Sequence, residues 1–135
     1  MHPQLIISRI ELHKISVPLK EPFVISLGPI YSADNVVVVI HTQQGLTGWG
    51  ECSPFMSING ETADTGLVVA DYFIKAWIGK NALEIEQRIT ELDSLIYGNN
   101  SIKSAFDMAL YDLASKHAGL PLYRYLGGKE NKIIA

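Results

Sequence analysis

Residues 98–128 predict a helix, a stop and a second short helix, and this order strongly limits the folds open to the chain. We expect Asn100 or Ser101 to cap the first helix, because a short polar side chain accepts the free amide hydrogens of a first turn. Gly119 is placed to end this helix, and Pro121 to begin the next one. The predicted inner face carries side chains at helical spacing, namely Ile102, Phe106, Ala109, Leu113 and His117.

The composition is that of one ordinary globular domain. The 135 residues are 47% hydrophobic and 19% charged, which argues against disorder. The net charge of -3 is spread along the chain without a basic cluster, so we expect no nucleic-acid or membrane partner. The apolar run at 5–7 is too short for a signal peptide before Arg9 interrupts it. We therefore expect a cytoplasmic protein.

The residues that most often carry chemistry are scattered. Cys52 is the single cysteine, so an internal disulfide is excluded and a buried thiol is expected. The histidines have no metal-ligand spacing, and we expect His117 to pack as a neutral ring on the apolar face of its helix. Glu51 lies in an apolar region near Glu61 and Asp64, but a carboxylate that ends a strand usually caps or pairs. We assign no catalytic and no metal-binding residue to this chain.

The first half predicts strands. An alternation begins at Ile10 and changes parity by Ile15, so we expect a bulge or a change of environment near Lys14. Pro18 and Pro22 lack an amide hydrogen and should stop the ladder there. The β-branched run 35–42 predicts a central strand, followed by a turn at 43–45 and a strand at 46–51. Together these segments predict an antiparallel meander.

The second half predicts helices, over about 67–78 and 85–96, ending at Gly79 and Gly98. Asn81 and Glu84 resemble a capping box at the start of the second helix. In the third helix, Lys103 with Asp107 and Asp112 with Lys116 stand four residues apart, which favours weak ion pairs. Strands followed by helices predict an α+β fold, a three-stranded antiparallel meander followed by a helical bundle.

Two predicted loops, 21–34 and 52–62, contain more apolar residues than solvated loops need. The first holds Phe23 and Ile30, and the second holds Phe55, Met56 and Ile58. Such residues either pack beneath their own domain or cover a pocket shared with a second domain. The residues alone leave both interpretations open.

Three segments resemble the N-terminal capping domain of the enolase superfamily, in its muconate-lactonising and mandelate-racemase branch. They are EPFVISLG at 21–28, GWGECSPFMSINGETADT at 48–65 and SIKSAFDMALYDLASKHAGLPLYRYLGG at 101–128. The first two are most similar to the dipeptide epimerases. The resemblance implies a capping domain over 1–128. It also implies that 129–135 begin the first strand of a (β/α)8 barrel that lies outside this chain.

The resemblance further implies the chemistry of the whole protein, an isomerase. In that family two lysines move a proton at an amino-acid α-carbon, and Mg2+ stabilises the enolate. Those groups belong to the ends of barrel strands, so we expect the 135-residue chain alone to be inactive. The implied partners are a dipeptide, the chain's own barrel and further copies in a homo-oligomer.

The family's two loops help to select the substrate. By resemblance we expect substrate contacts from Phe23, Ser26, Gly28, Phe55 and Ile58. Gly28 stands where Ala-Glu epimerases have an arginine that pairs with the substrate's carboxylate, so a small or apolar dipeptide is the better expectation. The six apolar residues expected to be exposed without the barrel are Phe23, Phe55, Met56, Ile58, Leu122 and Leu126.

Two alternatives stay open. The chain could cap another member of the branch, such as an o-succinylbenzoate synthase, an N-acylamino-acid racemase or a muconate cycloisomerase, because a fold does not determine its chemistry. It could also be a stand-alone binding or assembly module without catalysis. The reading frame beyond Ala135 would distinguish them.

Overall fold

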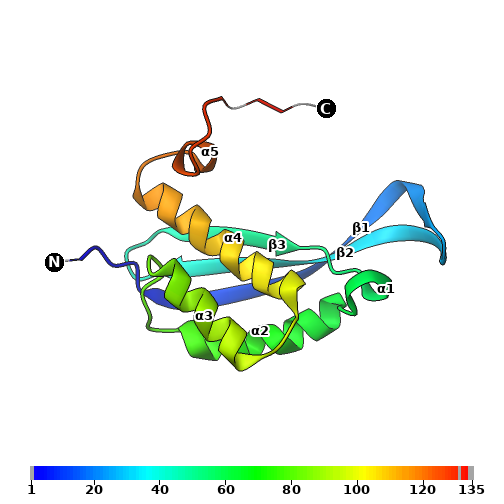
Figure 1. Ribbon diagram of the computed structural model, residues 1–135, viewed down its shortest axis with the longest axis horizontal. Coiled ribbons are helices and arrows are strands. Elements are labelled where there is room, and N and C mark those ends of the chain that lie inside the picture. The colour runs from blue at the N-terminus through cyan, green and yellow to red at the C-terminus, as the bar shows by residue number, and fades with distance from the viewer. Residues whose placement is uncertain (1, 131, 134–135) are drawn as a thin grey trace.

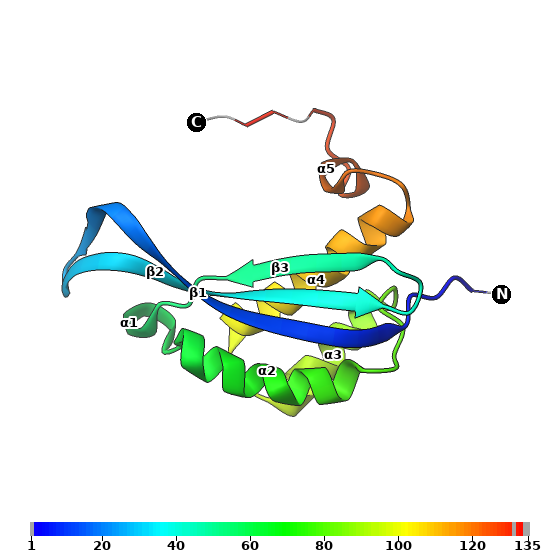
Figure 2. The ribbon, with the colours of Figure 1, turned by 180° about the vertical axis from the view of Figure 1, so that it is seen from behind.

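The computed structural model describes residues 2–130 and 132–133 and has two layers. A three-stranded antiparallel sheet in the order β1-β2-β3 is covered on one face by helices, and Figure 2 shows its other face in front of them. The elements are β1 (Ile7–Ile25), β2 (Gly28–Thr42), β3 (Thr47–Cys52), α1 (Met56–Asn59), α2 (Ala63–Trp77), α3 (Ile85–Leu95), α4 (Asn100–His117) and α5 (Leu122–Tyr125). The predicted α+β class and meander are confirmed.

The strands β1 and β2 are much longer than predicted. Their register runs without a shift from Arg9 opposite His41 to Pro18 opposite Ser32, so no bulge lies at Lys14. What changes near that residue is the environment, because Ile10 is buried and the strand beyond residue 15 is mostly exposed. The turn at 43–45 and the pairing of β2 with β3 are as predicted.

The segment predicted as a loop at 21–34 is the outer part of a hairpin, which we call the arm (residues 16–34). The ladder shifts between Pro18 and Phe23 and resumes with Phe23 opposite Ile30 and Ile25 opposite Gly28. The prediction was wrong because β1 is an edge strand, where a proline costs few hydrogen bonds and a shift bypasses it. The arm extends past the helices and bends toward the side on which α5 lies (Figure 1).

Close contact between β3 and α4 holds the two layers together. Gly48 and Gly50 alternate on the face of β3 that meets Ala105 and Ala109 of α4. A Cβ at position 48 would lie 2.6 Å from Leu113 Cγ, and a Cβ at position 50 would overlap the Ala105 carbonyl. Only glycine therefore lets the helix axis come so close to the strand.

The free edge of β3 is closed by an ion pair of α4. Asp112 accepts a hydrogen bond from the Trp49 amide at 2.9 Å, and Lys116 Nζ donates to the Thr47 carbonyl at 2.7 Å. The two side chains also pair with each other at 2.9 Å, as the sequence predicted. Covering these groups makes the edge a poor template for another strand.

The core lies between the sheet and the three long helices. Phe106 packs edge-to-face against Phe73 and against Trp77, and its ring centroid lies 5.3 Å from that of each. Cys52 is buried as expected, and burial raises the pKa of its thiol. In α2, Phe73 and Trp77 are buried, while Ile78, which the sequence placed inside the helix, follows its last residue and is 43% exposed.

The predicted N-terminal caps of two helices were wrong. The Ser101 amide of α4 donates to both carboxylate oxygens of Glu61, at 3.1 and 3.2 Å, so the cap is a residue 40 positions earlier. Asn81 accepts hydrogen bonds from the Leu5 and Leu83 amides at 2.9 and 3.1 Å and so links the segment before β1 to the turn before α3. That helix begins at Ile85 without a side-chain cap.

Two surface predictions on α4 were also wrong. His117 is exposed, because the last turn of the helix extends past the sheet. Lys103 pairs with Asp93 at 3.0 Å and not with Asp107, since its ammonium also donates to the Ile96 carbonyl at 2.8 Å at the end of α3. A cation there compensates the free carbonyls of a helix C-terminus.

The end of the chain follows the predicted stop. Gly119 has a φ of +72° and ends α4, and Pro121 precedes α5. Lys132 and Ile133 form no strand, while residues 131 and 134–135 lie outside the described part. The strand at 129–135 therefore stays a prediction. None of the described helices is long and apolar enough to cross a membrane.

The contact between β3 and α4 gives a first prediction. We expect Gly50→Ala to lower the free energy of unfolding by about 3 kcal/mol, because its Cβ overlaps the α4 backbone. Gly66→Ala in α2 is the matched control. Its Cβ would meet Ile102 at 3.7 Å, an ordinary contact, so it should raise that free energy by about 0.5–1 kcal/mol. Urea unfolding measures both, and equal effects would contradict the close-contact argument.

Candidate functional site

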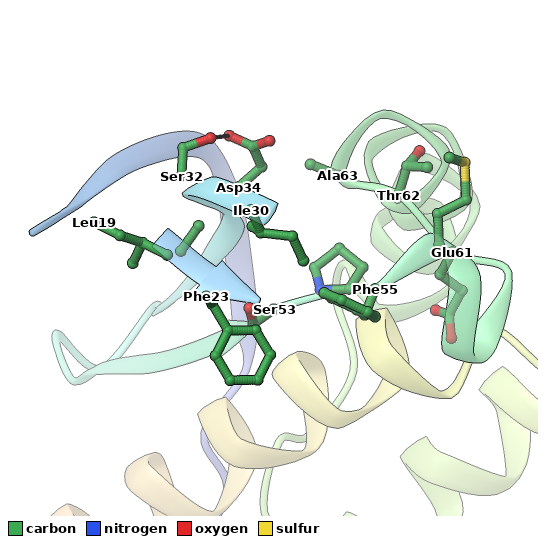
Figure 3. A pocket seen from close by; sticks show the side chains of 13 residues that line it. Leu19, Phe23, Ile30, Ser32, Asp34, Ser53, Phe55, Glu61, Thr62 and Ala63 are labelled. Carbon is green, nitrogen blue, oxygen red and sulfur yellow. Dashed lines mark hydrogen bonds between the residues drawn. The ribbon is translucent and has the colours of Figure 1, made fainter. Parts of the chain in front are cut away.

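A hollow of about 470 Å³ lies between the arm and the segment 53–63 and opens to solvent. Figure 3 shows side chains entering it from the two long strands on one side and from the turn around α1 on the other. Its lining is Leu19, Phe23, Ile30, Ser32, Ala33, Asp34, Ser53, Pro54, Phe55, Met56, Glu61, Thr62 and Ala63. We call it the arm hollow.

The arm supplies an apolar wall with a polar inner end. Leu19, Phe23 and Ile30 face the hollow, and Phe23 is 60% exposed although it is a large apolar side chain. Nearer the sheet, Asp34 accepts a hydrogen bond from Ser16 at 2.6 Å. This wall can contact an apolar group, while its one carboxylate repels an acidic one.

The opposite wall is built on a single helical turn, α1. Gly60 ends this turn with a φ of +74°, a conformation that glycine adopts at no steric cost. The Asn59 side-chain oxygen accepts from the Phe55 amide at 3.3 Å and from the Glu61 amide at 3.0 Å, so it joins both ends of the turn. The turn thereby presents Phe55 and Met56 to the hollow.

The wall is fixed to the rest of the domain by Glu61. Its side chain lines the hollow with its stem, and the carboxylate reaches the first turn of α4. Glu61 is only 6% exposed. Nothing in the sequence indicates this contact between residues 61 and 101.

The structure brings some of the predicted substrate contacts together and separates others. Phe23 and Phe55 both line the arm hollow. Ser26 and Gly28 lie at the turn of the arm, and Ile58 lies on α1 with 79% of its surface exposed, so these three stand outside the lining. Leu19 was missed because it precedes the predicted loop, and no pattern in the sequence around it indicates a site.

Five of the six apolar side chains that were expected to be exposed are exposed. Phe23, Met56, Ile58, Leu122 and Leu126 are between 39% and 79% exposed. Phe55 is intermediate, because it turns into the hollow. These residues form apolar surface on the arm, on α1 and around α5, and apolar surface of this kind usually meets a partner.

The three carboxylates that stood out in the sequence do not meet. Glu51 accepts from the Asn35 amide group at 2.6 Å, and Asp64 pairs with Lys14 at 2.8 Å. Glu61 binds the α4 amide instead. Over residues 2–130 and 132–133, no group of three His, Cys, Asp or Glu side chains is arranged to hold a metal ion.

A separate charged cluster occupies the uncovered face of the sheet. Glu11 accepts from His13 Nε2 at 2.9 Å and from His41 Nε2 at 2.8 Å, and it also pairs with Arg9. The His13 and His41 hydrogen bonds, with a smaller effect of Arg9, lower the pKa of the Glu11 carboxyl from 4.5 to about 2. This cluster faces away from the helices and contributes nothing to the lining of the arm hollow.

The fold and the arm hollow define an N-terminal capping domain. The chain belongs to the family described as mandelate racemase / muconate lactonizing enzyme, N-terminal domain, which matches residues 9–127. The resemblance seen in the sequence is thereby confirmed. The similar proteins include dipeptide epimerases, which are isomerases.

Three of the similar proteins are epimerases of different dipeptides. The D-Ala-D/L-Ala epimerase of Cytophaga hutchinsonii is 56% identical over 130 residues, 96% of this chain and 35% of that protein. The hydrophobic dipeptide epimerase of Enterococcus faecalis is 40% identical over 95% of this chain and 36% of that protein. The L-Ala-D/L-Glu epimerase of Bacillus subtilis is 40% identical over 90% of this chain and 34% of that protein. This chain thus spans about a third of their length.

Solved structures agree with the fold. The dipeptide epimerase from Cytophaga hutchinsonii, complexed with Mg and the dipeptide D-Ala-L-Val, matches with a TM-score of 0.92 over 96% of this chain and 35% of that one. The substrate-liganded L-Ala-D/L-Glu epimerase from Bacillus subtilis matches with a TM-score of 0.86 at 38% identity, over 92% of this chain and 35% of that one.

The charged cluster on the sheet gives a second prediction. The pKa of Glu11 is lower in the folded chain, so its ionised form stabilises the fold above pH 4.5, and this stabilisation is lost as the pH falls toward 2. We expect NMR titration to give a pKa of about 2, and His13→Gln to raise it. His2→Gln, which alters an exposed histidine outside the cluster, is the control. A Glu11 pKa near 4.5 in the unmodified chain would contradict the cluster's geometry.

Proposed function

We propose that this chain is the substrate-capping domain of a dipeptide epimerase, an isomerase that moves a proton at an amino-acid α-carbon. The observation that carries the proposal is the arm hollow, whose two walls include Phe23 and Phe55, one from each of the two segments that resemble the epimerases. The 56% identity to the Cytophaga relative supports the same assignment. The arm bends toward the side of α5 and the chain's C-terminal segment, which is consistent with a following domain on that side (Figure 1).

In this proposal the chain binds and encloses the substrate and leaves proton transfer to the rest of the protein. Phe23 and Phe55 would contact the dipeptide's side chains, and the closed arm would exclude water from the reacting carbon. Ser26, Gly28 and Ile58 would contact it from the turn of the arm and from α1. A cytoplasmic location, a barrel that begins at 129–135 and a homo-oligomer remain predictions.

The proposed substrate is a small or apolar dipeptide. The residues that line the arm hollow, all of them described, include two carboxylates and no lysine or arginine. An acidic side chain would therefore enter without a cation to pair with and would face Asp34. Gly28 offers no cation at the turn of the arm. The names of the Cytophaga and Enterococcus relatives, D-Ala-D/L-Ala and hydrophobic dipeptide epimerases, support this choice.

Mg2+ belongs to this proposal through the rest of the protein. The described side chains do not fit a Mg2+ site, because a hard cation requires several convergent oxygen ligands and no such group is present among them. We therefore assign the metal ligands and the two lysines to the expected barrel. No step of the reaction is assigned to a residue of this chain.

A solvent-exchange assay tests the function. The full-length protein, incubated with Mg2+ in deuterated water, should incorporate deuterium at the α-carbon of Ala-Ala and Ala-Val and epimerise them. We expect kcat/KM for Ala-Glu to be lower by about tenfold or more, because the carboxylate finds no partner. Mass spectrometry measures the incorporated deuterium, and polarimetry measures the epimerised dipeptide. Absence of exchange with all three dipeptides would show that the proposed function is wrong.

Gly28 gives a further prediction about specificity. We expect Gly28→Arg in the full-length protein to raise the ratio of kcat/KM for Ala-Glu over Ala-Val by about tenfold, since it adds a cation for the carboxylate. No described atom lies within 4 Å of a Cβ there, so the side chain has room, but the φ of +124° strains any residue except glycine.

Gly28→Ala is the matched control, because it carries the same backbone strain without the charge. Both ratios are measured in variants whose circular dichroism matches that of the unmodified protein. An unchanged ratio in Gly28→Arg, or the same change in Gly28→Ala, would remove position 28 from the proposed specificity site.

A further inference from the structure

We propose that Glu61 is a positioning residue for the substrate site, acting by fixing the α1 wall to the first turn of α4. This inference rests on the proposed function for its effect on the dipeptide and on the geometry alone for its effect on the wall. It assigns to a buried carboxylate a role that no sequence pattern indicates.

The first support is the contact itself. Both carboxylate oxygens of Glu61 accept from the Ser101 amide, at 3.1 and 3.2 Å, and the residue is 6% exposed. A buried carboxylate is retained only where hydrogen bonds replace its water. The positive end of an 18-residue helix provides that compensation, so the contact defines one position for residue 61.

The second support is the way α4 begins. Its N-cap residue, Asn99, has a φ of +55° and uses its side chain to donate to the Tyr97 carbonyl at 3.1 Å. A local Ser or Asn would satisfy the helix end equally well. A cap from 40 positions away, unlike a local cap, also joins two segments that are distant in the chain.

The third support is the short path from Glu61 to the hollow. Glu61 donates its own amide to Asn59 Oδ1 at 3.0 Å, and the same oxygen holds the Phe55 amide at 3.3 Å. Phe55 and Met56 line the hollow, so the path from the α4 backbone to the wall passes through two side chains. On the other side of Glu61, Thr62 and Thr65 form the capping box of α2 and fix where the segment ends.

The consequence concerns binding. A wall held in place before the dipeptide arrives loses little freedom when the dipeptide binds, whereas a loose wall must be ordered by it. Loss of the anchor should therefore raise KM more than it lowers kcat. The arm does not depend on this contact and should keep its order.

The experiment compares variants of the full-length protein. Glu61→Ala removes the hydrogen-bond acceptor. Glu61→Gln keeps the side-chain length and one acceptor for the Ser101 amide, so it should keep most of the anchoring that Glu61→Ala loses. Glu84→Ala is the matched control, because Glu84 also precedes a helix and makes no side-chain cap hydrogen bond. Hydrogen–deuterium exchange of segment 53–60 and steady-state kinetics with Ala-Val are measured for each.

We expect Glu61→Ala to speed exchange over 53–60 by about tenfold with little change over the arm, and to raise KM by about fivefold with kcat nearly retained. Glu61→Gln and Glu84→Ala should stay close to the unmodified protein. Unchanged exchange in Glu61→Ala would overturn the proposal, and so would faster exchange spread evenly over the domain. A loss in kcat alone would do the same.

The two proposals fail separately. A full-length protein that epimerises no dipeptide would remove the proposed function, and the exchange measurement would still decide whether Glu61 anchors the wall. If Glu61→Ala does not fold, Glu61→Gln and Glu61→Asp decide the matter. The shorter aspartate cannot reach the α4 amide and should speed exchange over 53–60, and equal exchange in these two variants would overturn the anchor.

Discussion

The close contact between β3 and α4, where two glycines let the helix lie against the strand, positions the other elements of the domain. Gly48 and Gly50 meet the backbone of Ala105 and Ala109, and a methyl group at position 50 would already overlap it. The contact fixes the distance of α4 from the sheet and the direction of its axis. It thereby sets where α4 begins, beside Glu61, and where it ends, at the turn into α5.

The sheet is longer than the helical layer that covers it, and this difference creates the candidate site. The inner parts of β1 and β2 are held by the helices, while the arm relies on its own ladder and leaves Phe23 and Leu27 exposed. Together with α1 it encloses a hollow with apolar walls. An arm that is exposed on several sides suits a domain that closes over another surface, as the proposed capping role requires.

The candidate site was only partly predictable from the sequence. The apolar residues of 21–34 and 52–62 left the role of these segments open, and the family resemblance pointed to Phe23 and Phe55, which both line the hollow. The prediction of a loop at 21–34 was wrong because an edge strand tolerates prolines that would end a central strand. Glu61 could not be found, since its partner Ser101 is 40 residues away.

The α+β class, the order of the strands, the long helix and its stop at Gly119 can all be derived from the sequence, because periodicity, turn residues and a glycine cap act over a few residues. The group that caps α4, the cation that pairs with Asp93 and the point at which the sheet extends beyond the helices are set by the folded structure. Those outcomes depend on long-range packing, in which a buried polar group takes whichever partner the fold brings within hydrogen-bond distance.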